Sequence, residues 1–280
     1  MKLEVIILAA GQGTRMKSPL PKVLHPMAGR PLLQHVVDTA RCLQPRGIHV
    51  VVGHGAEQVK AALAADDLNW VTQEQQLGTG HAVLQAMPQV AADSTVLVLY
   101  GDVPLIHADT LAELARQGAE APALLTAQVE EPAGYGRILR NDSGDLVAVV
   151  EHKDASEEQL AIDEINTGVL AAPAADLNRY LPQVGNANSQ GEYYLPDVLS
   201  LAVAEGKRVA SCQAASELEI QGVNDRLQLN QVEREYQRLL AEQLMREGVA
   251  IAVGSRLDVR GSLRCGAGVV IDVNVVVEGD

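Results

Sequence analysis

Residues 5–17 read Val5-Ile-Ile-Leu-Ala-Ala-Gly-Gln-Gly-Thr-Arg-Met-Lys17, an aliphatic run that passes directly into a glycine-containing, basic loop. An unbroken aliphatic run of this length is typical of a strand that is buried on both faces, as in parallel sheets. Glycines after such a strand let backbone amides approach an anion closely. The stretch therefore predicts an α/β protein whose first strand leads into an anion-binding loop.

A second strand of the same character, from Thr95 to Tyr100, stops at Gly101 and Asp102. Between the two strands we expect a helix, a strand and two more helices, at 31–43, 49–52, 56–65 and 79–90. This alternation predicts βα units on a largely parallel sheet. Because ligands of open α/β sheets bind beyond the carboxyl ends of strands, the two polar loops after these strands are the expected site.

The pattern changes near residue 224. From Asn224 to Gly248 apolar residues recur at helical spacing among charged ones, which predicts a long helix near a domain boundary. Apolar residues then recur every six positions, in one register at Val253, Val259, Cys265, Ile271 and Val277, and in another at Leu257, Leu263, Val269 and Val275. This period predicts a β-helix, with a pair of amphipathic strands as the alternative. Because the repeat runs up to Asp280, we expect a longer protein.

The composition excludes several classes of protein. With 280 residues, 47% of them hydrophobic and 21% charged, the chain is neither disordered nor collagen-like. Short apolar runs and three widely spaced cysteines favour a cytoplasmic protein without a membrane partner. The net charge of −14 argues against nucleic-acid binding. Residues 1–30 are the exception, because five basic residues against one acidic residue can attract a small anion.

The loop after the first strand carries the basic side chains Arg15, Lys17 and Lys22. Together with the glycine amides they predict a phosphate cradle, and a plain turn is the alternative. The loop matches neither of two common cradles. A dinucleotide fingerprint needs a third glycine where Met16 stands, and no Gly-Lys pair is followed by the Ser or Thr of a Walker loop.

Polar groups also follow two other predicted elements. Asp102 is a lone carboxylate where a magnesium ion bridging phosphates needs one, although an Asp there can also form a turn or helix cap. Gln73 and the loop Leu77-Gly-Thr-Gly80 offer an amide and backbone groups that can read the edge of a nucleobase. The alternative for Thr79 is a helix cap.

Further clusters could bind sugar hydroxyls or an amide. They are Gly134-Tyr-Gly-Arg137, Glu151-His-Lys-Asp154, Glu164-Ile-Asn-Thr-Gly168 and Gly222-Val-Asn-Asp225. Each has a plainer alternative, since Lys153 beside Glu151 can be a surface pair and Asn224 can cap the long helix. The sequence contains no paired-histidine zinc helix, Cys-x-x-Cys motif or serine nucleophile elbow.

Taken in order, these motifs resemble those of the sugar-nucleotide pyrophosphorylases. More narrowly, they resemble the bacterial bifunctional members that join an N-acetylglucosamine-1-phosphate uridyltransferase to a glucosamine-1-phosphate N-acetyltransferase. The resemblance covers essentially the whole chain and implies a Rossmann-like nucleotidyltransferase domain with a mixed, mostly parallel sheet at 1–227. It further implies a linker helix at 228–248 and the start of a left-handed parallel β-helix at 249–280. The full-length protein is expected to be a homotrimer, with its acetyltransferase residues beyond Asp280.

The resemblance also implies an activity, which is Mg2+-dependent transfer of UMP from UTP to N-acetylglucosamine 1-phosphate. The products are UDP-N-acetylglucosamine, for peptidoglycan and lipopolysaccharide precursors, and pyrophosphate. Arg15, Lys22 and Asp102 are the expected catalytic residues, and Asp102 and Asn224 the expected metal ligands. The expected substrate-binding residues are Leu8, Ala9, Ala10, Gly11, Lys22, Gln73, Gly78, Thr79, Tyr100, Gly101, Asp102, Gly136, Glu151, Asn166 and Asn224.

Two alternative functions remain open. One is a pyrophosphorylase for another sugar or base, such as a glucose 1-phosphate thymidylyltransferase. The other is a non-catalytic regulatory protein that binds sugar nucleotides. The expected mechanism is in-line attack by the sugar phosphate on the α-phosphorus of UTP, which needs positioning and charge neutralisation rather than a strong base.

Overall fold

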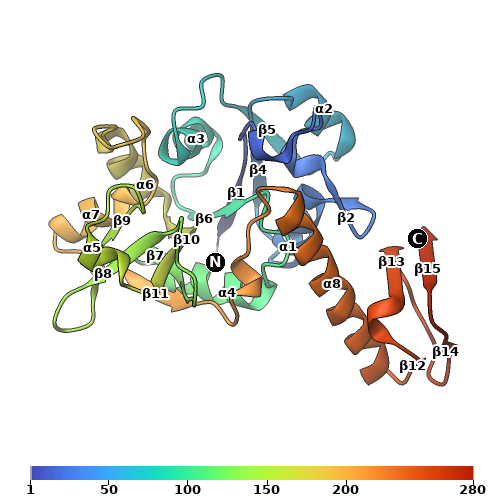
Figure 1. Ribbon diagram of the computed structural model, residues 1–280. Helices are drawn as coiled ribbons and strands as arrows, with labels where there is room; N and C mark the ends of the chain where they lie inside the picture. Colours follow the sequence, from blue (N-terminus) through green and yellow to red (C-terminus); the bar gives the residue numbers. More distant parts are fainter. Residues whose placement is uncertain (1, 280) are drawn as a thin grey trace.

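A computed structural model describes residues 2–279 and consists of a large α/β body and a small group of strands, joined by a long helix (Figure 1). Within those residues a nine-stranded sheet forms the core of the body. Its main path runs in the order β11-β7-β10-β6-β1-β4-β5, and β8 and β9 extend it from β10. The strands are β1 Leu3–Ala9, β4 Gly47–Val52, β5 Leu68–Thr72, β6 Thr95–Tyr100, β7 Ala123–Gln128, β8 Gly136–Arg140, β9 Leu146–Val150, β10 Glu164–Pro173 and β11 Ala210–Gln213.

The sheet is mixed and mostly parallel, as the sequence predicted. β1 pairs in parallel with β4 and β6, β4 with β5, and β7 with β11, whereas β10 runs antiparallel to its neighbours β6, β7 and β8. The chain moves outward from β1 to β4 and β5 and then returns to β6 on the other side of β1. This reversal places the ends of β1 and β6 side by side at the edge where open α/β sheets bind ligands.

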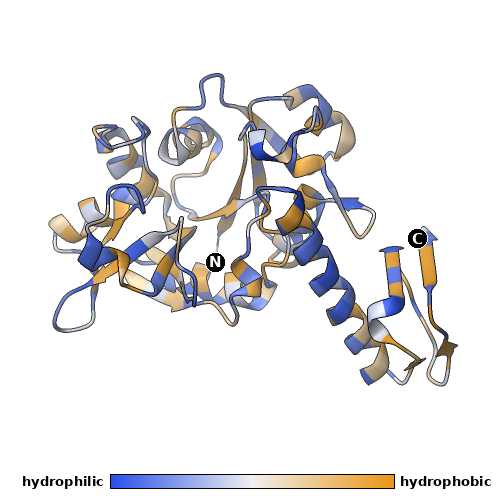
Figure 2. Cartoon of the chain, in the orientation of Figure 1, coloured by the Kyte–Doolittle hydropathy of each residue, from blue (hydrophilic) through white to orange (hydrophobic). Residues whose placement is uncertain are grey.

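Helices cover both faces of the sheet because the side chains of β1 alternate between two cores. Val5 and Ile7 pack with residues of α1, α2 and α4, whereas Ile6 and Leu8 pack with residues of α3, α6 and α7. Figure 2 shows the apolar colouring of the central strands between these layers. The helices are α1 Leu32–Cys42, α2 Ala56–Ala62, α3 Thr79–Ala86, α4 Ala108–Gln117, α5 Glu157–Leu160, α6 Ala174–Tyr180 and α7 Asp197–Ala204.

The predicted helix at 79–90 is shorter than expected. α3 ends at Ala86, and a 3-10 turn, Met87–Gln89, follows it. Pro88 explains the change, because proline cannot donate the hydrogen bond that an α-helix interior requires. Helix α2 also ends earlier than predicted, at Ala62, and strand β4 begins earlier, at Gly47.

The long helix predicted from 224 to 248 is α8 Arg226–Arg246, and its polar surface is plain in Figure 2. Beyond it, β12 Ala250–Ile251 pairs in parallel with β14 Val270–Ile271, and β13 Leu257–Gly261 with β15 Val275–Gly279. Leu257 pairs with Val275, 18 residues later, which equals three six-residue repeats. Two parallel pairs of strands, rather than one pair of amphipathic strands, agree with the expected start of a β-helix.

Not all of the apolar residues that recur every six positions are buried. Leu257, Val259 and Ile271 are buried against α8, but Val253 and Val269 are 39% and 40% exposed. Both exposed residues lie outside the paired strands, so the periodicity identifies strand positions better than turn positions.

A hydrogen-bonded contact joins α8 to β13. The buried side chain of Gln237 donates to the Val259 carbonyl (2.8 Å) and accepts from the Val259 amide (2.9 Å), as a neighbouring strand would. A second hydrogen bond joins β13 to the α/β body. It runs from the Gly261 amide to the Ala28 carbonyl (2.9 Å), in the hairpin of β2 Pro26–Met27 and β3 Arg30–Pro31.

We predict that Gln237→Leu detaches β13 locally from α8. The change leaves the buried amide and carbonyl of Val259 without partners, a cost of about 2–4 kcal/mol. Hydrogen exchange should therefore become faster at residues 257–261 and stay unchanged in β1. Gln231→Leu, on the exposed side of the same helix, is the control. Equal exchange at residues 257–261 in both variants would contradict this role of Gln237.

Candidate active site

The glycine-containing loop after β1 folds back onto the segment that carries Lys22. Gly13 has φ +61°, and a Cβ there would lie 2.5 Å from Cβ of Lys22. Only glycine fits such a close approach in this conformation. The loop is shaped by two 3-10 turns, Thr14–Met16 and Lys22–Leu24. Glycine is thus required by the fold at this position, and the close approach holds the loop against Lys22.

Three cavities meet at the carboxyl ends of β1 and β6. We call the first, of about 230 Å³, the glycine-loop cavity. Most of the predicted nucleotide-binding residues line it, together with Gln76 and Glu192, which the sequence did not single out. Its lining is Leu8, Ala9, Ala10, Gly11, Lys22, Val23, Gln73, Gln76, Gly78, Thr79, Ala82, Tyr100, Asp102 and Glu192.

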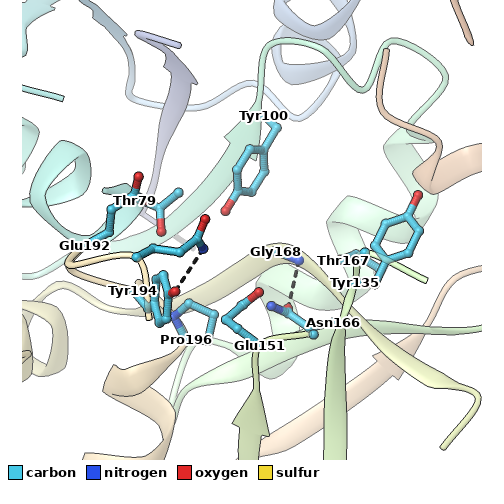
Figure 3. A pocket seen from close by; sticks show the side chains of 13 residues that line it. Thr79, Tyr100, Tyr135, Glu151, Asn166, Thr167, Gly168, Glu192, Tyr194 and Pro196 are labelled. Atoms are coloured by element: carbon cyan, nitrogen blue, oxygen red, sulfur yellow. Dashed lines mark hydrogen bonds between the residues drawn. The ribbon is translucent and has the colours of Figure 1, made fainter. Parts of the chain in front are cut away.

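The second, the Glu151 cavity, has about 250 Å³ and is shown in Figure 3. Its lining is Thr79, Tyr100, Gly134, Tyr135, Gly136, Glu151, Asn166, Thr167, Gly168, Gln190, Glu192, Tyr194 and Pro196. The register of β10 shifts between Asn166 and Leu170, and this irregularity brings Asn166 to Gly168 to the cavity. Asn166 Oδ1 accepts from the Gly168 amide at 2.8 Å, which fixes the side chain (Figure 3).

The third, the Arg15 cavity, has about 230 Å³. Its lining is Arg15, Tyr100, Asp102, Val103, Ala133, Gly134, Tyr135, Thr167, Ile220, Gly222, Asn224 and Gln228. Tyr100 lines all three cavities, and Asp102 lines both the glycine-loop and Arg15 cavities. The three cavities are therefore neighbours around one side chain, and together they can hold a molecule with several parts or two molecules at once.

Asp102, Lys22 and Asn224 converge where the glycine-loop and Arg15 cavities meet. The Lys22 ammonium donates to Asp102 Oδ2 and, at 3.3 Å, to Asn224 Oδ1. Both oxygens thus face one cationic centre, although the residues come from distant parts of the chain. Carboxylate and amide oxygens are also the ligands that Mg2+ prefers, with water and phosphate oxygens completing its shell. Residues 2–279 contain no cluster of three or more His, Cys, Asp or Glu suited to a metal, so an all-protein cage does not fit here.

Burial raises the pKa of Glu151, and the carboxylates of Asp197 and Asp154 raise it further, while a hydrogen bond from Asn166 opposes the shift. Figure 3 shows the Glu151 carboxylate directed into the cavity, toward Tyr100. Burial also raises the pKa of the Tyr100 phenol, with Glu151 and Asp102 contributing. Tyr100 therefore stays a neutral hydroxyl that can donate a hydrogen bond near neutral pH.

The raised pKa of Glu151 predicts opposite pH effects on binding and stability. Its carboxylate form accepts from hydroxyl groups, so the KM for a ligand in this cavity should fall as pH rises through the raised pKa. The contribution to stability is present below the unfolded-state pKa and is lost as pH rises through the folded-state value. In Glu151→Gln, neither the KM nor the unfolding free energy should change with pH in this range. If both quantities varied with pH in the variant as they do in the wild type, this account would be contradicted.

A segment that the sequence did not single out closes the Glu151 cavity. Gln190, Glu192 and Tyr194 lie on it, and its backbone pairs with the loop before α3 and with the first turn of that helix. The Gly80 amide donates to the Tyr193 carbonyl, and the Tyr193 amide donates to the Leu77 carbonyl, both at 2.8 Å. Two adjacent tyrosines in a chain with only six were the available sequence signal.

The structure shows whether Thr79, Lys153 and Asn224 have the capping and surface-pair roles that were the alternatives to substrate binding. Thr79 does not cap α3, and its Oγ1 accepts instead from the Leu195 amide at 3.0 Å. Lys153 contacts Gln190 Oε1 at 3.0 Å rather than Glu151. The cap of α8 is Asp225, which leaves the Asn224 side chain at the Arg15 cavity.

Gly101 differs from the other predicted substrate-binding residues, because it lines none of the three cavities. Its amide donates to the Leu8 carbonyl at 2.9 Å, and a Cβ would lie 3.1 Å from Leu33 Cδ1. In this structure Gly101 allows close packing beneath the site.

A mostly parallel sheet with a basic glycine loop and contiguous cavities at its carboxyl edge is suited to binding phosphorylated ligands. The family model described as the MobA-like NTP transferase domain matches residues 5–167, and the chain belongs to that family. Two solved structures share the fold. A nucleotidyl transferase from Methanothermobacter thermautotroptrophicus is 21% identical with a TM-score of 0.60, covering 85% of this chain and 99% of its own. A UDP-glucose pyrophosphorylase in complex with UDP-glucose is 20% identical with a TM-score of 0.70, covering 84% and 98%.

Curated relatives are much closer in sequence. The protein named "Bifunctional protein GlmU" of Stutzerimonas stutzeri is 57% identical over 280 residues, which is 100% of this chain and 62% of the relative. Its namesake in Azotobacter vinelandii is 59% identical over 276 residues, covering 98% of this chain and 61% of the relative. The chain thus spans about three fifths of the length of these relatives. Within residues 2–279, no helix is both long and apolar enough to cross a membrane.

Proposed function

We propose that this chain catalyses Mg2+-dependent transfer of UMP from UTP to N-acetylglucosamine 1-phosphate, releasing pyrophosphate and UDP-N-acetylglucosamine. The observation that carries the proposal is the convergence of Lys22, Asp102 and Asn224 where two cavities meet. The similarity to proteins named "Bifunctional protein GlmU" supports it. In this proposal acetyl transfer and a homotrimer belong to a longer protein.

The glycine-loop cavity holds the nucleotide in this proposal. Gln73 and Gly78 bind the uracil edge with Thr79 nearby, Leu8 to Gly11 lie along the nucleotide, and Tyr100 flanks the ribose. The Glu151 cavity holds N-acetylglucosamine, with Gly136, Glu151 and Asn166 against its ring and substituents. A Cβ on Gly136 would lie 3.2 Å from Glu151 Oε1, so glycine leaves the space that a sugar needs.

The reaction is a direct displacement. A phosphate oxygen of the sugar 1-phosphate forms a bond to the α-phosphorus of UTP, and the bond from that phosphorus to the bridging oxygen breaks. Pyrophosphate leaves with the electron pair. Lys22 and Arg15 offset the charge of the triphosphate and of pyrophosphate, and the attacking phosphate is already ionised at neutral pH. The site therefore needs no strong general base.

Asp102 and Asn224 would hold Mg2+ together with phosphate oxygens. When bound, the ion would neutralise phosphate charge and orient the reacting groups. Lys22 contacts both of these oxygens in the structure. If these two side chains held the ion, the Lys22 ammonium would instead be available to donate to the phosphate oxygens.

The experiment is to mix the purified chain with Mg2+, UTP and N-acetylglucosamine 1-phosphate and to follow pyrophosphate, then to repeat it with dTTP and with glucose 1-phosphate. We expect rapid release with the first pair alone. Release mainly with dTTP or glucose 1-phosphate would move the function to another pyrophosphorylase. No release from folded protein would favour a regulatory protein that binds sugar nucleotides.

A further inference from the structure

The segment before α8 is held against the loop that follows β6. The Val223 amide donates to the Asp102 carbonyl at 2.8 Å, and the Val223 side chain is fully buried. Asn224, the next residue, lines the Arg15 cavity together with Asp102. Helix α8 therefore begins directly beside this cavity, and its first residues can contact a ligand there.

The side chain of Gln228, in the first turn of α8, turns back toward Asn224. Its Oε1 accepts from the Asn224 amide at 2.8 Å, and its own backbone amide donates to Asp225 Oδ1 at 2.9 Å. A backbone N–H can only donate, so the atom of the Gln228 amide that faces Asn224 must be the oxygen. The backbone thus fixes the orientation of this amide, and its NH2 group faces away from Asn224.

The NH2 group of Gln228 is free to bind a ligand. Within residues 2–279 its Nε2 donates to no acceptor, and it is not among their buried atoms without a partner. Gln228 lines the Arg15 cavity, where the guanidinium of Arg15 supplies positive charge. The two N–H donors of the amide add neutral hydrogen-bonding capacity to the same cavity.

We propose that Gln228 is a phosphate-binding residue, whose NH2 group donates to a phosphate oxygen in the Arg15 cavity while its oxygen holds Asn224. This inference rests on the proposed function, because the phosphate is that of a substrate, either pyrophosphate or the sugar 1-phosphate. Hydrogen bonds to an ionised phosphate are roughly twice as strong as neutral ones. An amide forms them without adding a cation beside the oxygens of Asp102 and Asn224.

Capping of α8 alone does not require glutamine at this position. A glutamate carboxylate also accepts from a backbone amide, and negative charge is favourable in the first turn of a helix. Gln228→Glu therefore keeps the contact with the Asn224 amide and removes the NH2 donor. If Gln228 acted only as a cap, this variant would equal the wild type in stability and in substrate binding.

The test compares Gln228→Glu with the wild type in both directions of the reaction. It measures the KM for N-acetylglucosamine 1-phosphate at saturating UTP, and the KM for pyrophosphate at saturating UDP-N-acetylglucosamine. The KM for the contacted phosphate should rise about tenfold or more, with an unchanged unfolding free energy. A rise for pyrophosphate assigns the contact to the leaving group, and a rise for the sugar 1-phosphate assigns it to the attacking group. Unchanged KM values for both would overturn the proposal.

Two further variants separate the hydrogen bond from the added charge. Gln231→Glu places the same charge on an exposed residue three positions further along α8 and should keep both KM values. Equal rises in Gln231→Glu and Gln228→Glu would show a general repulsion of phosphate and contradict the contact. Gln228→Met removes the donor without adding charge, so it should raise the same KM. It should also lower the unfolding free energy, because the Asn224 amide loses its acceptor.

The failure of this inference differs from the failure of the proposed function. A wild type that releases no pyrophosphate from UTP would reject the function. A wild type that does so, with both KM values unaltered in Gln228→Glu, would reject only the role of Gln228. Equilibrium binding of pyrophosphate and of N-acetylglucosamine 1-phosphate, each with Mg2+, to the two folded proteins tests that role without turnover, and equal affinities for both ligands would reject it.

Discussion

Replacing Asp102 with Asn is expected to lower kcat/KM for pyrophosphate release by about 10³-fold, with little change in folding stability. The carboxylate lies where the glycine-loop and Arg15 cavities meet and accepts from Lys22. Asn keeps its shape but removes the charge that organises the cations around the reacting phosphates, and lost preorganised electrostatics of this kind costs 10² to 10³ or more. Initial rates at saturating Mg2+, together with thermal unfolding, measure both expectations.

The control for this variant is Asp109→Asn, an exposed carboxylate in the first turn of α4. It should retain wild-type rates. Asp102→Asn with turnover within threefold of wild type would show that this carboxylate does not serve the reaction. An equal loss in both variants would indicate a general electrostatic effect.

The second large effect is expected for Gly78→Ala. Gly78 has φ +111°, and a Cβ there would lie 2.6 Å from the carbonyl oxygen and 2.7 Å from the nitrogen of Tyr193. These are backbone atoms, so the two loops must separate and lose the hydrogen bonds that join Tyr193 to Leu77 and Gly80. We expect a loss of about 3 kcal/mol in unfolding free energy and at least a tenfold rise in the KM for UTP.

Gly144→Ala is the control for Gly78→Ala, because it introduces the backbone strain of an alanine at positive φ without a steric clash. Gly144 has φ +82° in the loop between β8 and β9, and no atom lies within 4 Å of a Cβ built there. It should lose only about 1 kcal/mol and keep the wild-type KM. If Gly78→Ala behaved like Gly144→Ala in both urea unfolding and UTP kinetics, the pairing of the two loops would not be needed for nucleotide binding.

The fold was predictable where the signal is local. The aliphatic run of β1 and its counterpart at Thr95–Tyr100 are buried on both faces, so their sequences alone identify them as central strands. The register that places Leu8 opposite Tyr100 depends on the strand order. Local periodicity does not encode that order, and the resemblance of the ordered motifs implied only a Rossmann-like domain with a mixed, mostly parallel sheet.

The site was predictable as far as its residues lie next to recognisable strands and glycines. The role of the loop that carries Tyr193 was not predictable, because it arises from hydrogen bonds to Leu77 and Gly80, more than a hundred residues away. Lys22 and Asn224 were both expected at the site, but their contact, between residues about two hundred positions apart, was not predicted. Such convergence is a property of the folded chain and has no sequence period.

The most direct test of the account is the stereochemical course at the α-phosphorus, because the account requires nucleotide and sugar phosphate to occupy neighbouring cavities around Tyr100 at the same time. The measurement uses one diastereomer of UTP with sulfur on the α-phosphorus, N-acetylglucosamine 1-phosphate and the purified chain. A single in-line displacement predicts an inverted configuration in the UDP-N-acetylglucosamine product. Retained configuration would show two successive displacements through a uridylylated group and would contradict the account.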